Sequence, residues 1–128
     1  MKKNKKFSIK VRLLSFKFAF EGLAHFFKTE HNAWIHLAAA VVVISAGLYF
    51  NLNVLEWLWI SLAICLVFIC EIINSAIERT VDLASSEVHP LAKQAKDLGA
   101  AATIIAAIFA VIVAIFIFAP YLYDLFQL

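Results

Sequence analysis

Four polar side chains with the chemistry of an active site lie in the segment EIINSAIERTVD, residues 71–82. They are Glu71, Asn74, Glu78 and Asp82, and their spacing places them within a wedge of roughly 80° on one helix. One carboxylate of such a stripe can act as a general base, and others can hold a magnesium ion that carries phosphates. The stripe therefore suggests phosphoryl transfer.

The elements that must position this polar stripe are predicted to be membrane helices. Of the 128 residues, 64% are hydrophobic and only 16% are charged, a balance outside that of soluble domains. Three stretches have no charged residue and approach the roughly 20 residues that span a bilayer as a helix: 37–52, 57–70 and 98–122. The fold class is expected to be an all-α membrane protein with a single domain, residues 1–128. Its membrane helices are expected at about 33–52, 56–82 and 90–120.

The segment before the first span is expected to form an amphipathic helix on the membrane surface, over residues 7–29. Its apolar residues recur at helical spacing, and its basic residues can face anionic headgroups. The apolar positions are Phe7, Val11, Leu14 and Phe18. A soluble amphipathic helix packed on protein would have the same pattern, so this alternative stays open.

The basic residues predict the orientation of the spans. All 11 Lys and Arg lie either before the first span or between the second and third, whereas the turn NLNVLE and the tail YLYDLFQL have none. Because basic loops remain on the cytoplasmic side, the N-terminus and the loop 79–97 are expected in the cytoplasm, with the turn and the C-terminus outside. The net charge of +2 then reflects topology and gives no reason to expect nucleic acid.

Glu71 is predicted to lie inside the membrane. If the second span begins near Trp57 and its inner boundary lies about 20 residues later, Glu71 is roughly 7 Å inside that boundary at 1.5 Å per residue. Intramembrane ionisable residues usually mark functional sites, so Glu71 is a candidate base for a lipid hydroxyl at headgroup depth. Glu78 and Asp82 have a simpler alternative, as interfacial charges paired with Arg79 or with later lysines.

The expected cytoplasmic segment, LASSEVHPLAKQAKDLG, offers groups for a soluble phosphate donor. Pro90 is placed to begin a helix that continues into the third span. Near its start, Lys96 can reach a phosphate and Asp97 a sugar hydroxyl. The alternative is that the lysines only reflect topology and that His89 only caps the helix. Neither GxxxxGK[ST] nor GxGxxG occurs, so a nucleotide site would have to be built from side chains at helix ends.

The combined motifs resemble those of the prokaryotic diacylglycerol kinase family, which are small integral-membrane lipid kinases. The matching segments are SFKFAFEG, TEHNAWIHLAAA, EIINSAIERTVD and HPLAKQAKD, in this order over nearly the whole chain. The resemblance implies transfer of the γ-phosphate of ATP to a lipid alcohol, with Mg²⁺, in a bacterial cytoplasmic membrane. It also implies a homotrimer with active sites between subunits.

The resemblance further implies a role for each matching position. Glu71 matches the general base, and Asn74 matches the amide close to the reacting centre. Glu30 and Glu78 match the carboxylates that hold the metal ion with the phosphates of ATP. The remaining matches are nucleotide contacts: Phe18, Glu87, His89, Lys96 and Asp97.

A trimer would also answer a physical problem, because Glu71 would face lipid unless a neighbouring subunit covered it. The third span has a small-residue stripe that permits close helix approach, at Ala102, Ala106, Ala110 and Ala114. This stripe can serve packing between subunits or within one.

Two lipid acceptors stay open, diacylglycerol and undecaprenol, since both present a primary hydroxyl at headgroup depth. The segments TEHNAWIHLAAA and HPLAK resemble the Gram-positive branch of the family, whose acceptor is undecaprenol. The diacylglycerol-specific branch tends to have a serine where this chain has Ala100. The resemblance therefore favours undecaprenol.

Two other functions are also compatible with three spans. A non-enzymatic assembly or regulatory subunit would leave Glu71 and Asn74 without a purpose. A proton- or ion-conducting oligomer would explain Glu71, but it normally needs polar groups at further depths. The first span beyond Ser45 and the third beyond Thr103 do not supply them. Phosphate incorporation from ATP would separate a kinase from both alternatives.

Overall fold

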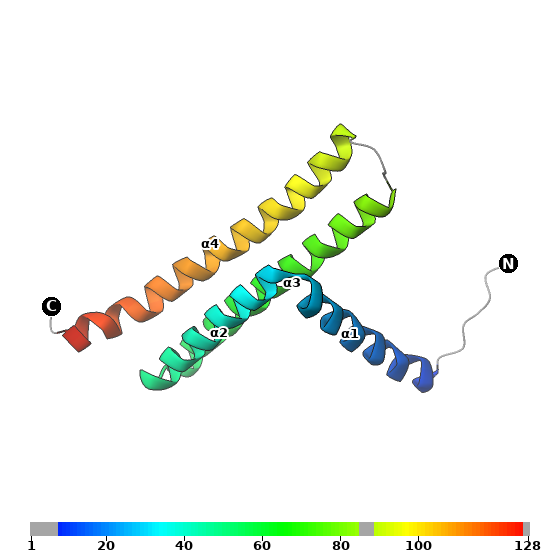
Figure 1. Cartoon of the computed structure of the whole chain (residues 1–128). Coiled ribbons are helices and arrows are strands. Elements are labelled where there is room, and N and C mark those ends of the chain that lie inside the picture. The colour runs from blue at the N-terminus through cyan, green and yellow to red at the C-terminus, as the bar shows by residue number, and fades with distance from the viewer. Residues whose placement is uncertain (1–7, 85–88, 127–128) are drawn as a thin grey trace.

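The computed structural model describes residues 8–84 and 89–126 and is all-helical over these ranges (Figure 1). Four helices follow one another along the chain: α1, Ile9–Thr29; α2, His31–Tyr49; α3, Val54–Ala84; and α4, Pro90–Phe126. The expected all-α class is thereby confirmed. Phe7 and Glu87, both named in the sequence analysis, lie outside the described residues.

Three of these helices, α2, α3 and α4, are long and apolar enough to cross a membrane, as the uncharged stretches predict. α4 begins at Pro90, the predicted start, but it continues past Pro120 to Phe126. The residue after this proline explains the continuation. Tyr121 packs its ring 5.4 Å from that of Phe50 and donates a hydrogen bond of 2.8 Å to Glu56, so the end of α4 is held against the turn between α2 and α3.

The turn between α2 and α3 is built from local hydrogen bonds. Asn51 has a φ of 53°, a left-handed conformation that asparagine tolerates better than most residues. The next N–H, of Leu52, donates to the Gly47 carbonyl at 3.1 Å and closes the end of α2. Asn53 Oδ1 accepts two N–H groups of the first turn of α3, and Glu56 accepts the Asn53 N–H at 2.8 Å. This reciprocal pair is a capping box, which begins α3.

α3 is the central element, since it packs against both α2 and α4. In Figure 1, α3 and α4 run alongside each other in opposite directions. Their contact buries Ile60, Ala63, Val113 and Ile117. Because lipid tails are as apolar as these side chains, close packing is the main stabilising term in such a contact.

The contact between α2 and α3 depends on a glycine. A Cβ atom at Gly47 would lie 2.8 Å from Cη2 of Trp57, closer than real Cβ atoms come. α2 therefore approaches the start of α3 closely because position 47 has no side chain.

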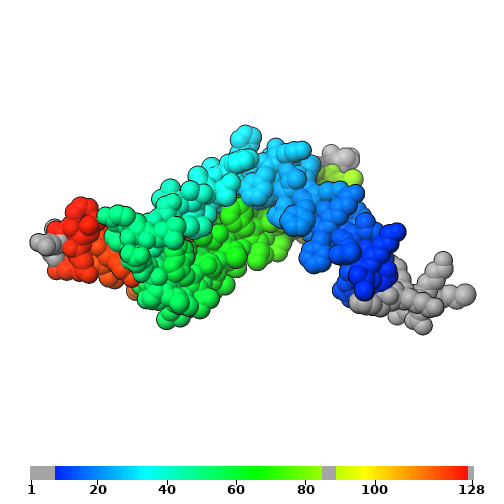
Figure 2. Space-filling model, turned by 90° about the horizontal axis from the view of Figure 1, so that it is seen from below, coloured from blue at the N-terminus to red at the C-terminus, as the bar shows by residue number. Residues whose placement is uncertain are grey.

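α1 leaves the bundle where it joins α2. Glu30 has extended backbone dihedrals, φ −102° and ψ 114°, which separate the two helices. In Figure 1, α1 projects from this junction away from the other helices, and Figure 2 shows it in blue as an extension of an elongated molecule. Phe26, near its end, is buried, whereas the apolar side chains along most of its length are exposed.

The small-residue stripe of α4 lies against helices of the same chain over much of its length. Ala106 is 2% exposed, whereas Ala102 is exposed. Ala110 and Ala114 line a pocket together with residues of α2 and α3. Packing within one subunit, one of the two roles considered for the stripe, therefore accounts for most of it.

Candidate active site

Glu71 lies in the C-terminal half of α3 and is only 7% exposed. Its Oε1 atom lies 3.0 Å from Nε2 of His36, which comes from α2. An ionised carboxylate at membrane depth costs about 2 to 3 kcal/mol even on lenient insertion scales, so a partner from the next helix is a strong stabilising feature. The expectation that Glu71 of a single chain would face lipid is wrong, because α2 of the same chain covers it.

Asn74 lies one turn further along α3 and has an unusual hydrogen-bonding state. Its Nδ2 donates to Glu78 Oε1 at 3.0 Å, which confirms that these two residues share a face. Its Oδ1 is buried and has no hydrogen-bond partner among the described residues. Buried amide oxygens are nearly always paired, so this atom is available to a donor such as a hydroxyl, or to a cation.

Gly99 of α4 provides the room for the Asn74 amide. A Cβ atom at position 99 would collide with Asn74 Oδ1. Gly99 is buried in the contact between α3 and α4. The Asn74 side chain can therefore occupy this position because Gly99, on the facing helix, has no side chain.

Glu30, at the junction of α1 and α2, is held against α3. The Ser75 hydroxyl donates a hydrogen bond to its Oε1, and Arg79 Nη2 donates another at 2.8 Å. These two donors, the Ser75 hydroxyl first, hold the pKa of Glu30 below its ordinary value of 4.5, although burial acts in the opposite direction. Glu30 is therefore an ionised carboxylate at neutral pH. Its partner Ser75 lies one turn from Glu71.

Arg79 connects α3 to the end of α1. Besides Glu30, it donates to the Thr29 hydroxyl at 2.6 Å and contacts the His25 ring. The sequence suggested Glu78 or Asp82 as partners for this arginine. The recorded carboxylate partner is Glu30 instead, because the junction of α1 and α2 packs beside this part of α3.

The outer polar residues are paired with one another. Lys96 of α4 forms an ion pair with Asp82 of α3, and Lys93 forms one with Asp97 within α4. His89 Nδ1 accepts a backbone N–H of the first turn of α4 at 3.2 Å. The structure thus shows two contacts named in the simpler alternatives, the pairing of Asp82 with a later lysine and the capping of the helix by His89. The nucleotide roles of these residues stay predictions.

The structure brings most, but not all, of the predicted site residues together. One group surrounds the C-terminal half of α3: Glu30, Glu71, Asn74 and Glu78. Lys96 joins the far end of the polar stripe through Asp82. Phe18 is 62% exposed on α1, the helix that points away from the bundle (Figure 1). Glu87 lies outside the described residues.

Several residues of the site were not assigned a role from the sequence: His36, Ser75, Arg79 and Gly99. One signal could have identified His36, because an imidazole near the start of an otherwise apolar span needs a polar partner. Ser75 gave a weaker signal, as the hydroxyl beside Asn74 and one turn after Glu71. Gly99 gave none, since its importance arises from the packing of two helices.

The sequence comparisons agree with this arrangement. Residues 17–118 match the pattern of the family described as prokaryotic diacylglycerol kinase. An undecaprenol kinase of Bacillus subtilis is 42% identical over 106 residues, which cover 83% of this chain and 86% of that protein. A diacylglycerol kinase of Synechocystis is 42% identical over 102 residues, covering 79% of this chain and 58% of that protein. A diacylglycerol kinase of Helicobacter pylori is 36% identical over 110 residues, which cover 80% of this chain and 86% of that protein.

Three apolar helices, a buried carboxylate with an unpaired amide oxygen one turn away, and a match over most of the chain lead to one assignment. The alternatives of a non-enzymatic subunit and an ion-conducting oligomer are not favoured. The chain belongs to the prokaryotic diacylglycerol kinase family and is a membrane lipid kinase, a phosphotransferase with an alcohol acceptor.

Proposed function

We propose that this kinase transfers the γ-phosphate of ATP to the primary hydroxyl of a membrane lipid, with Glu71 as the general base. The observation that carries the proposal is the buried Glu71 carboxylate, one turn from the unpaired Oδ1 of Asn74. The hydroxyl proton moves to Glu71 while the lipid oxygen forms a bond to the γ-phosphorus. The bond from this phosphorus to the bridging oxygen breaks, and ADP leaves.

Asn74 is assigned to the reacting centre beside Glu71 in this scheme, and the single proton of the lipid hydroxyl goes to Glu71 and not to this amide. Its Oδ1 is an acceptor atom, and the described residues offer it no hydrogen-bond donor. Its Nδ2 is already bound to Glu78, which fixes the amide so that Oδ1 points away from that carboxylate. Holding the lipid hydroxyl beside Glu71 would supply much of the rate, because oriented reactants react far faster than free ones.

Glu30 and Glu78 are proposed to hold the Mg²⁺ that accompanies ATP. Magnesium prefers oxygen ligands and commonly takes one or two carboxylates together with substrate phosphates. An ionised Glu30, a Glu78 one turn from Ser75 on the same helix, and the free Asn74 oxygen fit that preference. In the described ranges, no group of three or more His, Cys, Asp or Glu side chains could hold a metal. The residues thus suit an ion that arrives with its phosphates, where it would neutralise their charge.

The nucleotide is proposed to bind at the start of α4, near the end of α3. Lys96 would exchange its contact with Asp82 for a phosphate, and Asp97 would accept a hydroxyl of the sugar. His89, Glu87 and Phe18 are assigned to the nucleotide by the family resemblance. The ion pair with Asp82 supports this role of Lys96, because it holds the ammonium group beside the polar stripe.

α1 is proposed to lie on the inner membrane surface, with the N-terminus in the cytoplasm and the C-terminus outside. Its exposed apolar side chains need a cover, and an interfacial helix can bury them in the headgroup region. The distribution of Lys and Arg supports this orientation for a protein of a bacterial cytoplasmic membrane.

A homotrimer with sites between subunits is proposed from the family resemblance. A test is to mix two inactive variants, Glu71→Gln and Lys96→Met, during assembly. If a site takes Glu71 from one subunit and Lys96 from another, mixed trimers regain part of the activity. If a preparation shown to contain mixed oligomers regains no activity, each site lies within one chain.

The acceptor is proposed to be undecaprenol. Of two relatives that each match over 86% of their own length, the undecaprenol kinase is 42% identical to this chain and the diacylglycerol kinase of Helicobacter pylori is 36% identical. Both lipids place a primary hydroxyl at headgroup depth, and apolar contacts discriminate only weakly between them. The difference in rate should therefore be moderate.

The experiment that tests this function is phosphate transfer from labelled ATP by the purified protein in mixed micelles. Diacylglycerol and undecaprenol are offered in parallel, with and without a chelator of Mg²⁺. Labelled lipid with the wild type, and none with Glu71→Gln or with the chelator, is the expected result. A folded protein that labels neither lipid would contradict the proposal, and a faster rate with diacylglycerol would reverse the choice of acceptor.

A further inference from the structure

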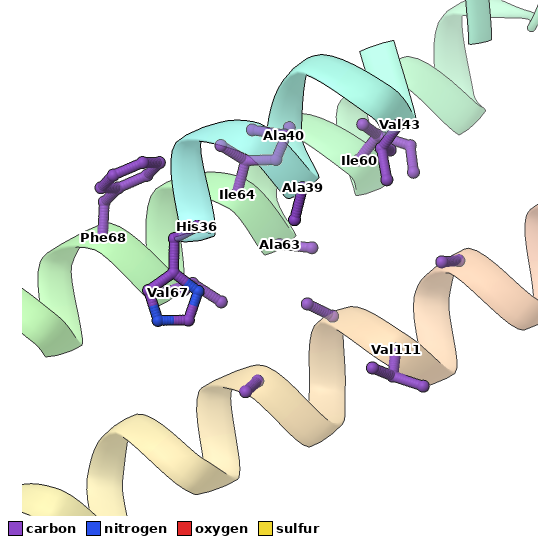
Figure 3. Close-up of a pocket in the computed structure, with 13 residues that line it drawn as sticks. His36, Ala39, Ala40, Val43, Ile60, Ala63, Ile64, Val67, Phe68 and Val111 are labelled. Carbon is purple, nitrogen blue, oxygen red and sulfur yellow. The ribbon is translucent and has the colours of Figure 1, made fainter. Parts of the chain in front are cut away.

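A pocket of about 170 Å³ lies between α2, α3 and α4 (Figure 3). Of the described residues that line it, His36 alone is polar, and the others are Ala, Val, Ile and Phe. Figure 3 shows the His36 ring projecting from α2 into this apolar surrounding, near Val67 of α3. A leucine would suit such a place better, so the imidazole requires an explanation.

The explanation lies in the contact with Glu71. His36 Nε2 and Glu71 Oε1 are 3.0 Å apart, and the two side chains are 23% and 9% exposed. To act as the proposed base, Glu71 has to be an ionised carboxylate, which can only accept, so in this role His36 carries a proton on Nε2 and donates the bond. The bond occupies Oε1 and leaves the other carboxylate oxygen of Glu71 for a substrate proton.

The ring that makes this bond is itself held in place. Phe68, one turn from the start of the polar stripe, meets the His36 ring edge-on, with ring centroids 6.4 Å apart and planes at 73°. Phe68 packs in turn against Phe27, and Phe27 packs against Trp34. This aromatic cluster joins α1, α2 and α3, so the direction of the His36 donor is set by three helices.

From this geometry we infer that His36 is a positioning residue for Glu71, an inference that rests on the proposed role of Glu71 as the base. Its Nε2–H bond holds the carboxylate in one rotamer and directs the free oxygen to the lipid hydroxyl. Without that bond, a side chain with three rotatable bonds would sample other directions, and misplacement by about 1 Å can cost on the order of a hundredfold in rate.

The test compares three substitutions of His36 in the phosphate-transfer assay, with kcat and KM determined separately. His36→Gln retains an N–H donor at the position of Nε2. His36→Leu fills the space without a donor. His36→Asn has an N–H donor, but its side chain is too short to reach Glu71. We expect kcat to fall by about ten- to a hundredfold in the Leu and Asn variants, with KM for ATP nearly unchanged. His36→Gln should stay within about threefold of the wild type, because it keeps the hydrogen bond.

The matched control is Val43→Leu, which changes an apolar residue of the same helix and pocket and should keep the wild-type rate. In the Glu71→Gln background, His36→Leu should have no further effect, since a positioning residue acts through Glu71. If His36→Leu does not fold, the contrast between the Gln and Asn variants decides. Equal rates for His36→Gln and His36→Asn would overturn the inference, as would a folded His36→Leu with the wild-type kcat. Loss of transfer in the wild type itself would instead contradict the proposed function.

Discussion

The two ends of α3 each have a glutamate, and the surroundings of the two glutamates differ. At its N-terminal end, Glu56 accepts hydrogen bonds from the Asn53 N–H and the Tyr121 hydroxyl, so a capping box and a helix contact are both completed. In its C-terminal half, Glu71 accepts a bond from His36, but Asn74 beside it keeps a buried oxygen without a partner in the described ranges.

The difference separates a structural carboxylate from one for which a catalytic role is proposed. A polar network in which every group is paired stabilises a fold and offers nothing to a ligand. A buried group left unpaired costs free energy, so its retention indicates a partner that arrives later. By this criterion Glu56 belongs to the fold, and the unpaired oxygen of Asn74 supports the role proposed for its region in the reaction.

The largest expected effect comes from exchanging each glutamate for glutamine. Glu71→Gln should lower kcat by at least about a hundredfold, because glutamine cannot take the proton of the lipid hydroxyl. Glu56→Gln should keep the wild-type kcat, since its amide oxygen still accepts the Tyr121 hydroxyl. Initial rates of labelled phosphate transfer, with circular dichroism to verify folding, distinguish the two. Similar losses in both variants would remove the distinction between the ends.

The next effect concerns the space around Asn74. Gly99→Ala places a Cβ atom against Asn74 Oδ1, so the amide must move, and kcat should fall by about tenfold or more. Gly22→Ala is the matched control, because a Cβ atom there meets nothing within 4 Å. This control should keep its rate and gain up to about 1 kcal/mol of helix stability. A fully active Gly99→Ala enzyme would show that the position of Asn74 is not critical.

A smaller effect is expected at the structural end. Tyr121→Phe removes the hydroxyl that binds Glu56, which should lower the free energy of unfolding by about 1 kcal/mol. The kcat of phosphate transfer should not change, because no buried side-chain N or O atom at this end lacks a partner among the described residues. Thermal unfolding in detergent gives the first quantity and the transfer assay gives the second. A fall in kcat without a fall in stability would link this end to the reaction.

The smallest effect is a pH dependence at the functional end. The hydrogen bonds from Ser75 and Arg79 lower the pKa of Glu30 in the folded state below 4.5, its ordinary value. Its contribution to stability is therefore fully present well above pH 4.5 and is lost as the pH falls below 4.5 through the folded-state pKa. The difference in unfolding free energy between the wild type and Glu30→Gln should be constant near neutral pH and shrink in acid. A constant difference down to the acid limit would argue against this contact.

Much of the fold could be predicted from the sequence because its elements depend on local properties. Uncharged stretches of sufficient length predict the three membrane helices, and Pro90 marks the start of α4. The polar stripe on α3 follows from helical periodicity, and the bond between Asn74 and Glu78 confirms part of it. The end of α4 beyond Pro120 was not predicted, since Tyr121 and the α2–α3 turn hold it from a distance.

The sequence by itself determined which helices form and which residues of each helix share a face, because 3.6 residues per turn relates neighbours on one helix. Only the tertiary structure decided how those faces meet. It placed His36 on Glu71, Ser75 and Arg79 on Glu30, and Gly99 against Asn74. The physical reason is that the rotation and register of one helix against another depend on the packing of many side chains at once, which no local spacing contains.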